Sequence, residues 1–166
     1  MQKNIIRVGE EDSAILENLS EECYVLNAAF GEDFCRKFMT QAAQEERIVL
    51  FYGDNAIAAA KAFGADGVIL DLGSEEVKDK LAAVRKELGK GSIVGLFTRN
   101  RRHESMLVSE AEPDFVIFKV WKDGFEGVKE LTDWYADFFL IQSAAWVMEE
   151  GAPVQELRTD FVIKNV

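Results

Sequence analysis

The chain has 166 residues, of which 48% are hydrophobic and 30% charged, and its formal net charge is −11 at pH 7. A chain of this length buries about 70% of the surface that it exposes when unfolded, so we expect a single domain over residues 1–166. The excess of acidic residues argues against nucleic acid as a partner, because phosphate backbones favour basic surfaces. No apolar run approaches the roughly 20 residues that span a bilayer, and the first residues form no secretory signal. Two cysteines without ligand spacing fit a reducing compartment, so we expect a cytoplasmic protein with no membrane partner.

Short apolar runs rich in Val, Ile and Phe recur about every 23 residues, with helical patterns between them. Such runs are typical of strands that a parallel sheet buries on both faces. They predict eight strands, at residues 4–8, 23–28, 47–52, 67–72, 92–98, 114–120, 139–143 and 160–165.

Three of the intervening helices carry clear end signals. One covers residues 55–61, with Asp54 as its N-cap and Gly64 after its end. A longer charged helix begins at an N-cap Ser74 and closes before Gly89. The third, residues 124–136, places five side chains on one face: Phe125, Val128, Leu131, Thr132 and Tyr135.

A phrase that begins at an aspartate repeats along the chain. Asp66-Gly67-Val68-Ile69 returns as Asp114-Phe115-Val116-Ile117 and as Asp160-Phe161-Val162-Ile163, in steps of 48 and 46 residues. Odd and even strands thus form two sequence classes, as alternate strands do in the layers of a closed barrel, whereas an open sheet would have more polar edge strands. We therefore predict an α/β fold, a compact (β/α)8 TIM-type barrel lacking the final helix. One outer face is then bare, and we expect a partner subunit, as in a homodimer, or the N-terminal residues to cover it.

Several stretches match one family of barrels in chain order: Gly53-Asp54, residues 62–68, Ile93-Val94-Gly95, residues 102–106, Asp114-Phe115-Val116, residues 134–137 and Asp160-Phe161-Val162. Over about residues 47–166 the chain resembles the thiamine phosphate synthase and thiazole tautomerase (TenI-like) superfamily, as a divergent bacterial member. The resemblance implies an activity that joins a pyrimidine diphosphate to a thiazole phosphate, with Mg²⁺ bridging the diphosphate.

The chain departs from this family where the chemistry is carried. After the third strand the family has Asn-Asp-Arg and this chain has Gly53-Asp54-Asn55, so Asp54 is one candidate Mg²⁺ ligand. After the fourth strand the family's histidine and glutamine are lost, and Asp71 is a second candidate ligand by its position alone. The seventh strand should end in two glycines, but Gln142-Ser143-Ala144 stands at the predicted end, and its Cβ atoms would obstruct a phosphate. Only Val166 follows the predicted eighth strand in this sequence, so we expect no loop there to complete a phosphate cradle.

The strongest basic cluster, residues 99–103, comes just after the fifth strand, at the end of a barrel where active sites form. Arg99, Arg101 and Arg102, with the preceding Thr98, are candidate ligands for an anion. The alternative is that these arginines pair with surface acids such as Glu104.

Two further residues are candidates for catalysis. Lys119 is late in the sixth strand, where a lysine can hold a phosphate, form a Schiff base or extend to solvent. His103 is the only histidine and so the only side chain expected to titrate near neutral pH.

The lost loop residues favour a degenerate thiamine phosphate synthase-like barrel that is non-catalytic and binds a partner or a small phosphorylated ligand. Two alternatives stay open. One is an active Mg²⁺-dependent synthase-type transferase or thiazole tautomerase with a rearranged site, and the other is a different enzyme that uses Lys119.

Overall fold

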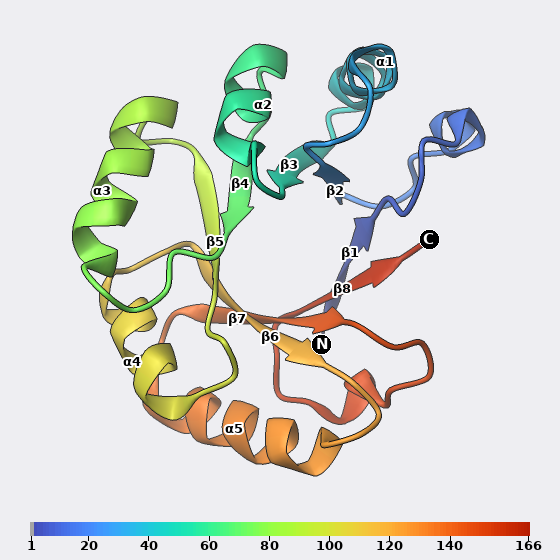
Figure 1. Ribbon diagram of the computed structural model, residues 1–166. Helices are drawn as coiled ribbons and strands as arrows, with labels where there is room; N and C mark the ends of the chain where they lie inside the picture. Colours follow the sequence, from blue (N-terminus) through green and yellow to red (C-terminus); the bar gives the residue numbers. More distant parts are fainter. Residues whose placement is uncertain (1) are drawn as a thin grey trace.

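Eight parallel strands close into a barrel in chain order in the computed structural model, which describes residues 2–166 (Figure 1). The ring closes where five residues of the last strand pair with the first, from Lys3 opposite Phe161 to Arg7 opposite Asn165. The predicted TIM-type barrel is therefore confirmed. The strands are β1 (Lys3–Arg7), β2 (Cys23–Asn27), β3 (Ile48–Tyr52), β4 (Gly67–Leu70), β5 (Ile93–Phe97), β6 (Phe115–Val120), β7 (Gln142–Val147) and β8 (Phe161–Asn165).

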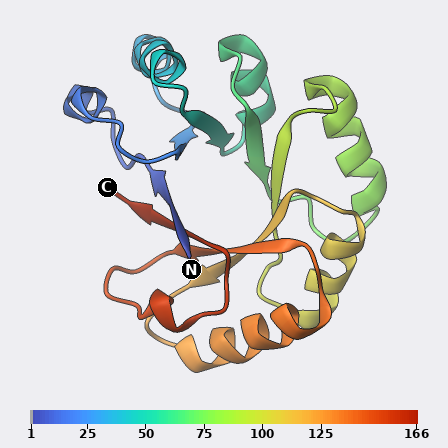
Figure 2. The same cartoon turned by 180° about the vertical axis from the view of Figure 1, so that it is seen from behind.

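Helices cover only part of the barrel's outer surface. The α-helices, which follow β2 to β6 in order, are α1 (Glu32–Gln44), α2 (Ala56–Phe63), α3 (Val77–Leu88), α4 (Arg102–Glu110) and α5 (Phe125–Phe138). Short 3-10 helices, η1 (Ser13–Glu17) and η2 (Val154–Glu156), replace an α-helix after β1 and after β7. The helices consequently form an incomplete ring, and β1 and β8 lie at its opening (Figures 1 and 2). None of the helices within residues 2–166 has the length and apolarity that crossing a membrane requires.

The barrel interior is filled by side chains that alternate along every strand. A buried layer of β-branched residues, Val25, Ile69, Ile117 and Ile163, comes from the four even strands. Above it the odd strands supply Arg7, Tyr52, Phe97 and Trp146. The Trp146 ring centroid lies 5.1 Å from that of Tyr52 and 5.2 Å from that of Phe97, and the Arg7 guanidinium carbon lies 4.7 Å from it. We call the three rings, Tyr52, Phe97 and Trp146, the aromatic layer, and it closes the interior towards the C-terminal ends of the strands.

The repeated aspartates all lie at the opposite end, where the even strands begin. The Oδ2 atoms of Asp66, Asp114 and Asp160 accept hydrogen bonds from the backbone N–H of Val49, Val94 and Ser143, at 2.9, 2.7 and 2.9 Å. In return, each aspartate's own N–H donates to the carbonyl of the same partner at 2.9 Å. Each aspartate thus ties the start of an even strand to the odd strand before it. The repeat therefore stabilises the N-terminal face of the barrel and lies away from the end that carries chemistry.

The predicted position of the seventh strand is wrong. The strand is not at residues 139–143 but at Gln142–Val147, because α5 continues to Phe138 and residues 139–141 connect it to the strand. Phe139 and Ile141 pack against the core from this connection. Phe138 and Leu140 are 72% and 101% exposed. The strand is instead set in place by the hydrogen bond from Ser143 to Asp160. The loop after β7 therefore covers residues 148–153, and Gln142-Ser143-Ala144 is the start of the strand rather than its end.

Two predicted N-caps are also wrong, whereas the helix ends are confirmed. Asn55, not Asp54, precedes α2, and no side chain caps it. Glu76, rather than Ser74, precedes α3. Gly64 and Gly89 end these helices with φ of 68° and 101°, a backbone conformation that favours glycine. The five predicted core residues of α5 are all buried.

Candidate functional site

A small cavity of about 240 Å³ opens above the aromatic layer, at the C-terminal ends of β4, β5 and β6. This is the end of a barrel where active sites form. We call it the mouth cavity, and its lining combines charged, amide and aromatic side chains: Asp71, Phe97, Arg99, Asn100, Lys119 and Trp121.

The loop after β5 is held in an unusual conformation at this cavity. Arg99 and Asn100 have φ of 57° and 55°, which costs a residue with a side chain on the order of 1–3 kcal/mol. The Asn100 side chain offsets this cost by pairing with the backbone of β6. Its Nδ2 donates to the Lys119 carbonyl at 2.7 Å, and its Oδ1 accepts from the Lys119 N–H at 3.0 Å. The loop therefore fixes Arg99 beside β6.

Two cations near the C-terminal ends of the strands, Lys119 in the mouth cavity and Arg7 at the end of β1, have no acidic partner within residues 2–166. The Lys119 Nζ lies 5.0 Å from the Phe97 ring centroid and makes no ion pair. The half-buried Arg7 donates only to neutral acceptors, from Nε to the Asn165 Oδ1 at 2.9 Å and from Nη2 to the Val147 carbonyl at 3.0 Å. Burial lowers the pKa of Arg7, an effect that Tyr52 partly opposes. Both cations contact the aromatic layer, and their charge is available to an anion.

The third cation at the mouth is already paired. The Arg99 Nε donates to the Asp71 Oδ1 at 3.0 Å, and that same oxygen accepts from the Gly73 N–H at 3.2 Å. Both side chains of this pair are about half exposed, and such pairs contribute less than about 1 kcal/mol to stability. An incoming anion can therefore compete with Asp71 for Arg99.

The structure brings together three of the predicted site residues, Arg99, Lys119 and Asp71. The other members of the basic cluster point elsewhere. Arg101 pairs with Glu104 at 3.2 Å, as the alternative of surface ion pairs predicted. The Arg102 guanidinium carbon lies 5.2 Å from the Trp134 ring centroid on α5, and His103 is exposed on α4.

Thr98 is fully buried, and both hydrogen bonds of its hydroxyl go to backbone groups. It donates to the Ile117 carbonyl at 3.0 Å and accepts from the Asn100 N–H at 3.1 Å. Its role in the structure is to hold the β5–α4 loop.

Sequence reasoning missed Arg7, Asn100 and Trp121. Arg7 ends a strand whose polarity suggested only an edge, and a cation at the C-terminal end of a barrel strand was the signal that could have identified it. Asn100 belongs to the basic cluster, but its importance lies in a contact with β6 that local sequence does not reveal. Trp121 directly follows β6 and is 41% exposed.

The chain is similar to known proteins both in sequence and in shape. A thiamine-phosphate synthase from Erythrobacter litoralis is 32% identical over 105 residues, which cover 58% of this chain and 47% of that protein. The thiamine phosphate pyrophosphorylase from Pyrococcus furiosus superposes on 97% of this chain and 84% of its own, with a TM-score of 0.69 at 11% identity. The predicted resemblance to the thiamine phosphate synthase superfamily is confirmed. The aligned part spans only about half of the curated synthase, and no protein-family model matches the chain.

The fold by itself serves several functions. An HpcH/HpaI aldolase from Desulfitobacterium hafniense covers 99% of this chain with a TM-score of 0.66 at 10% identity. The glycerol uptake operon antiterminator regulatory protein from Listeria monocytogenes covers 99% with the same TM-score at 14% identity. An enzyme and a regulatory protein thus share this architecture, so the site has to decide the function.

Neither of the two candidate Mg²⁺ ligands, Asp54 and Asp71, belongs to a cluster of metal-binding side chains within residues 2–166. Asp54 is exposed in the loop after β3, and Asp71 is already bonded to Arg99. Within residues 2–166, no three side chains among His, Cys, Asp and Glu lie close enough together to hold a metal ion. The donor set of this chain therefore does not form a carboxylate cage, and we derive no step through a metal.

The loop after β7 is acidic where a synthase-like barrel would bind phosphate. It carries Glu149 and Glu150, and the Glu149 Oε1 accepts from the Lys122 N–H at 2.8 Å. The one glycine, Gly151, has φ of 90°, and a Cβ there would lie 2.9 Å from the Lys122 side chain. Carboxylates repel phosphate, so this loop does not form a phosphate cradle. The cations at this end of the barrel lie instead on β1, on β6 and in the β5–α4 loop.

Proposed function

We propose that this thiamine phosphate synthase-like barrel binds a small phosphorylated molecule at its mouth cavity without catalysing the synthase reaction. The observation that carries the proposal is the pair of cations, Arg7 and Lys119, that contact the aromatic layer and lack an acidic partner within residues 2–166. The rest of the chain is strongly acidic, with a net charge of −11, so two unpaired cations at one end of the barrel form a local exception. A partly buried cation gains most from an anion that replaces its lost water.

Each residue at the mouth has a distinct part in this proposal. Lys119 and Arg7 hold phosphate oxygens, and Arg99 joins them as its pair with Asp71 opens. Asn100 acts through Lys119 and Arg99 as a positioning residue. The exposed Trp121 and the Phe97 ring offer apolar contact to the organic part of the ligand.

Two features support binding rather than catalysis. Asp71 is occupied by Arg99, whose guanidinium stands where a metal would have to bind, and the loop after β7 presents acids instead of a phosphate cradle. We therefore propose that binding does not require Mg²⁺. The active synthase-type transferase and the Lys119 Schiff-base enzyme are the outcomes that would replace this proposal.

Titration calorimetry with inorganic phosphate and with pyrophosphate, each with and without Mg²⁺, tests the binding site. We expect Lys119→Met and Arg7→Lys to weaken pyrophosphate binding, the first by about tenfold, since one charge-assisted contact is worth about 1.5 kcal/mol. Arg102→Gln is the matched control, because Arg102 stacks on Trp134 on the outer surface, and it should leave affinity unchanged. Thermal melts of all variants separate lost binding from lost folding.

Two activity assays test the absence of catalysis. Incubation with a pyrimidine diphosphate, a thiazole phosphate and Mg²⁺ should release no pyrophosphate. Release that is lost in Asp54→Ala and Asp71→Ala would establish an active transferase instead. Borohydride trapping of a carbonyl compound that is abolished by Lys119→Met would establish the lysine enzyme.

A further inference from the structure

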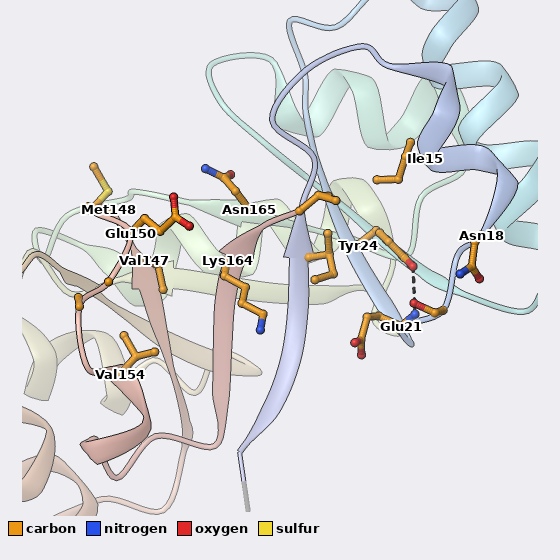
Figure 3. A pocket seen from close by; sticks show the side chains of 15 residues that line it. Ile15, Asn18, Glu21, Tyr24, Val147, Met148, Glu150, Val154, Lys164 and Asn165 are labelled. Atoms are coloured by element: carbon orange, nitrogen blue, oxygen red, sulfur yellow. Dashed lines mark hydrogen bonds between the residues drawn. The ribbon is translucent and has the colours of Figure 1, made fainter.

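The side of the barrel that lacks α-helices carries a continuous groove. One hollow of about 610 Å³ lies on the outside of β1 and β8, between η1 and the loop after β7 (Figure 3). A second hollow of about 590 Å³ adjoins it and shares Ile15, Asn165 and Val166 with it. We call the two together the β1–β8 groove. It shares no lining residue with the mouth cavity. It lies on the outer face that we expected a partner subunit or the N-terminal residues to cover.

The floor of the groove is apolar. Ile6 of β1 lines it. Ile15 enters from η1 and Val154 from η2 (Figure 3). Met148, just after β7, is 41% exposed and adds to this apolar surface, and Val166 lines both hollows. Around most of the barrel the corresponding surface is covered by a helix. On α5, for example, Phe125, Val128 and Leu131 are buried in the core that the helices share with the strands. The surface of the groove is therefore of the type that an amphipathic helix covers.

The rim of the groove is acidic. Glu10, Asp12, Glu21 and Glu150 line the two hollows, against the single base Lys164. In a twofold dimer built on this groove, the acids of one copy would face the same acids of the other, at a cost in repulsion. A helix with lysines or arginines beside its apolar stripe complements both parts of the groove. The stripe packs on the apolar floor, and the basic side chains face the acidic rim. Charge complementarity thus favours a basic partner over a second copy of this chain.

We propose that the β1–β8 groove is a docking site for a basic amphipathic helix of another protein. The helix lies on the outside of β1 and β8, between η1 and the loop after β7. Its apolar residues pack on Ile6, Ile15 and Val154, and its basic residues pair with Glu21 and Glu150.

A pair of synthetic helical peptides provides the probe. One is a roughly 18-residue peptide with leucines at helical spacing and lysines beside them, and the other has glutamates in place of the lysines. Fluorescence anisotropy with the intact chain should show binding of the lysine peptide, with the glutamate peptide at least about tenfold weaker.

Matched charge reversals distinguish the groove from general attraction to an acidic protein. Glu21→Lys combined with Glu150→Lys should lower the affinity for the lysine peptide by about tenfold. Glu126→Lys combined with Glu130→Lys makes the same change of net charge on exposed positions of α5 and should change affinity less than about twofold. Equal losses in the two double variants would overturn the proposal.

A second comparison tests the apolar floor. Val166→Ser and Ile15→Ser should each lower the affinity for the lysine peptide. Leu140→Ser, at a fully exposed leucine outside the groove, should leave that affinity unchanged. Unchanged affinity in both floor variants would overturn the proposal. A stable dimer in light scattering would also overturn the proposal if Glu21→Lys with Glu150→Lys strengthened it or Ile15→Ser dissociated it. A second copy of the chain would then occupy the groove. Phosphate and pyrophosphate binding at the mouth should be the same in all these variants, so that failure here is distinct from failure of the proposed function.

Discussion

Removing one of the repeated aspartates should destabilise the barrel without affecting its mouth. Asp114 is the most informative, since its carboxylate accepts from the Val94 N–H at 2.7 Å and also pairs with the Arg85 Nη2 at 3.3 Å. Val94 is fully buried, so Asp114→Ala leaves its N–H without an acceptor. Leaving a buried donor unpaired costs about 1–3 kcal/mol. The partly exposed ion pair adds at most about 1 kcal/mol.

The structure therefore predicts a loss of about 2–3 kcal/mol for Asp114→Ala, and a fall in Tm of about 4–10 °C for a chain of this length. Asp114→Asn keeps an oxygen acceptor and should lose less than half as much. Arg85→Gln removes only the ion pair and should cost less than about 1 kcal/mol.

Urea unfolding followed by circular dichroism measures these differences, with Asp123→Ala as the control. Asp123 is exposed, and its side chain makes no hydrogen bond within residues 2–166. The reasoning is refuted if Asp114→Ala is no less stable than Asp123→Ala, or if Arg85→Gln accounts for the whole effect of Asp114→Ala.

Three further predictions concern the interior. Gly95→Ala should lose about 1–3 kcal/mol of stability, because the new Cβ would lie 2.4 Å from the Phe115 ring. Gly127→Ala, in open space on α5, should gain about 0.5–1 kcal/mol. In urea titrations the unfolding midpoints of the two variants should therefore move in opposite directions. Burial and the charges of Asp66 and Glu22 raise the pKa of Cys23 from 9.0 to about 12. Below pH 9 the thiol is therefore protonated in both the folded and the unfolded chain. Above pH 9 the unfolded chain loses the thiol proton first. Stability should thus fall as the pH rises from 9 towards 12, and a Cys23→Ala variant with an unchanged slope would contradict this. Asn100→Ala should release the β5–α4 loop and weaken pyrophosphate binding several-fold in calorimetry, with a loss of stability near 1 kcal/mol, and unaltered affinity would show that Lys119 needs no positioning.

The barrel was predictable because its determinants are periodic and local. The aspartate phrase and the apolar runs recur at one spacing, and glycines such as Gly64 and Gly89 end helices through a backbone preference of their own. The seventh strand was misplaced because residues 139–141 are all apolar, although Leu140 is fully exposed. The start of the strand at Ser143 depends on a carboxylate 17 residues away. Hydrophobicity alone does not encode such a distant partner.

The candidate site was predictable only in part, for the same reason. Arg99 and Lys119 could be named because they come at the C-terminal ends of predicted strands. Arg99 and Arg102 look equivalent in sequence, yet one reaches Asp71 and the other stacks on Trp134. Their directions are decided by two residues with positive φ and by the bonds of Asn100 to β6, which bring together positions 19 residues apart.

The sequence by itself determined a closed α/β barrel and its resemblance to thiamine phosphate synthases. Both follow from repeated patterns and element lengths, which fix the order of the strands. Only the tertiary structure decided which cations face the mouth, that the aspartate repeat serves stability, and that the groove has an acidic rim. Those properties depend on distances between side chains from different strands, and such distances exist only once the barrel has closed.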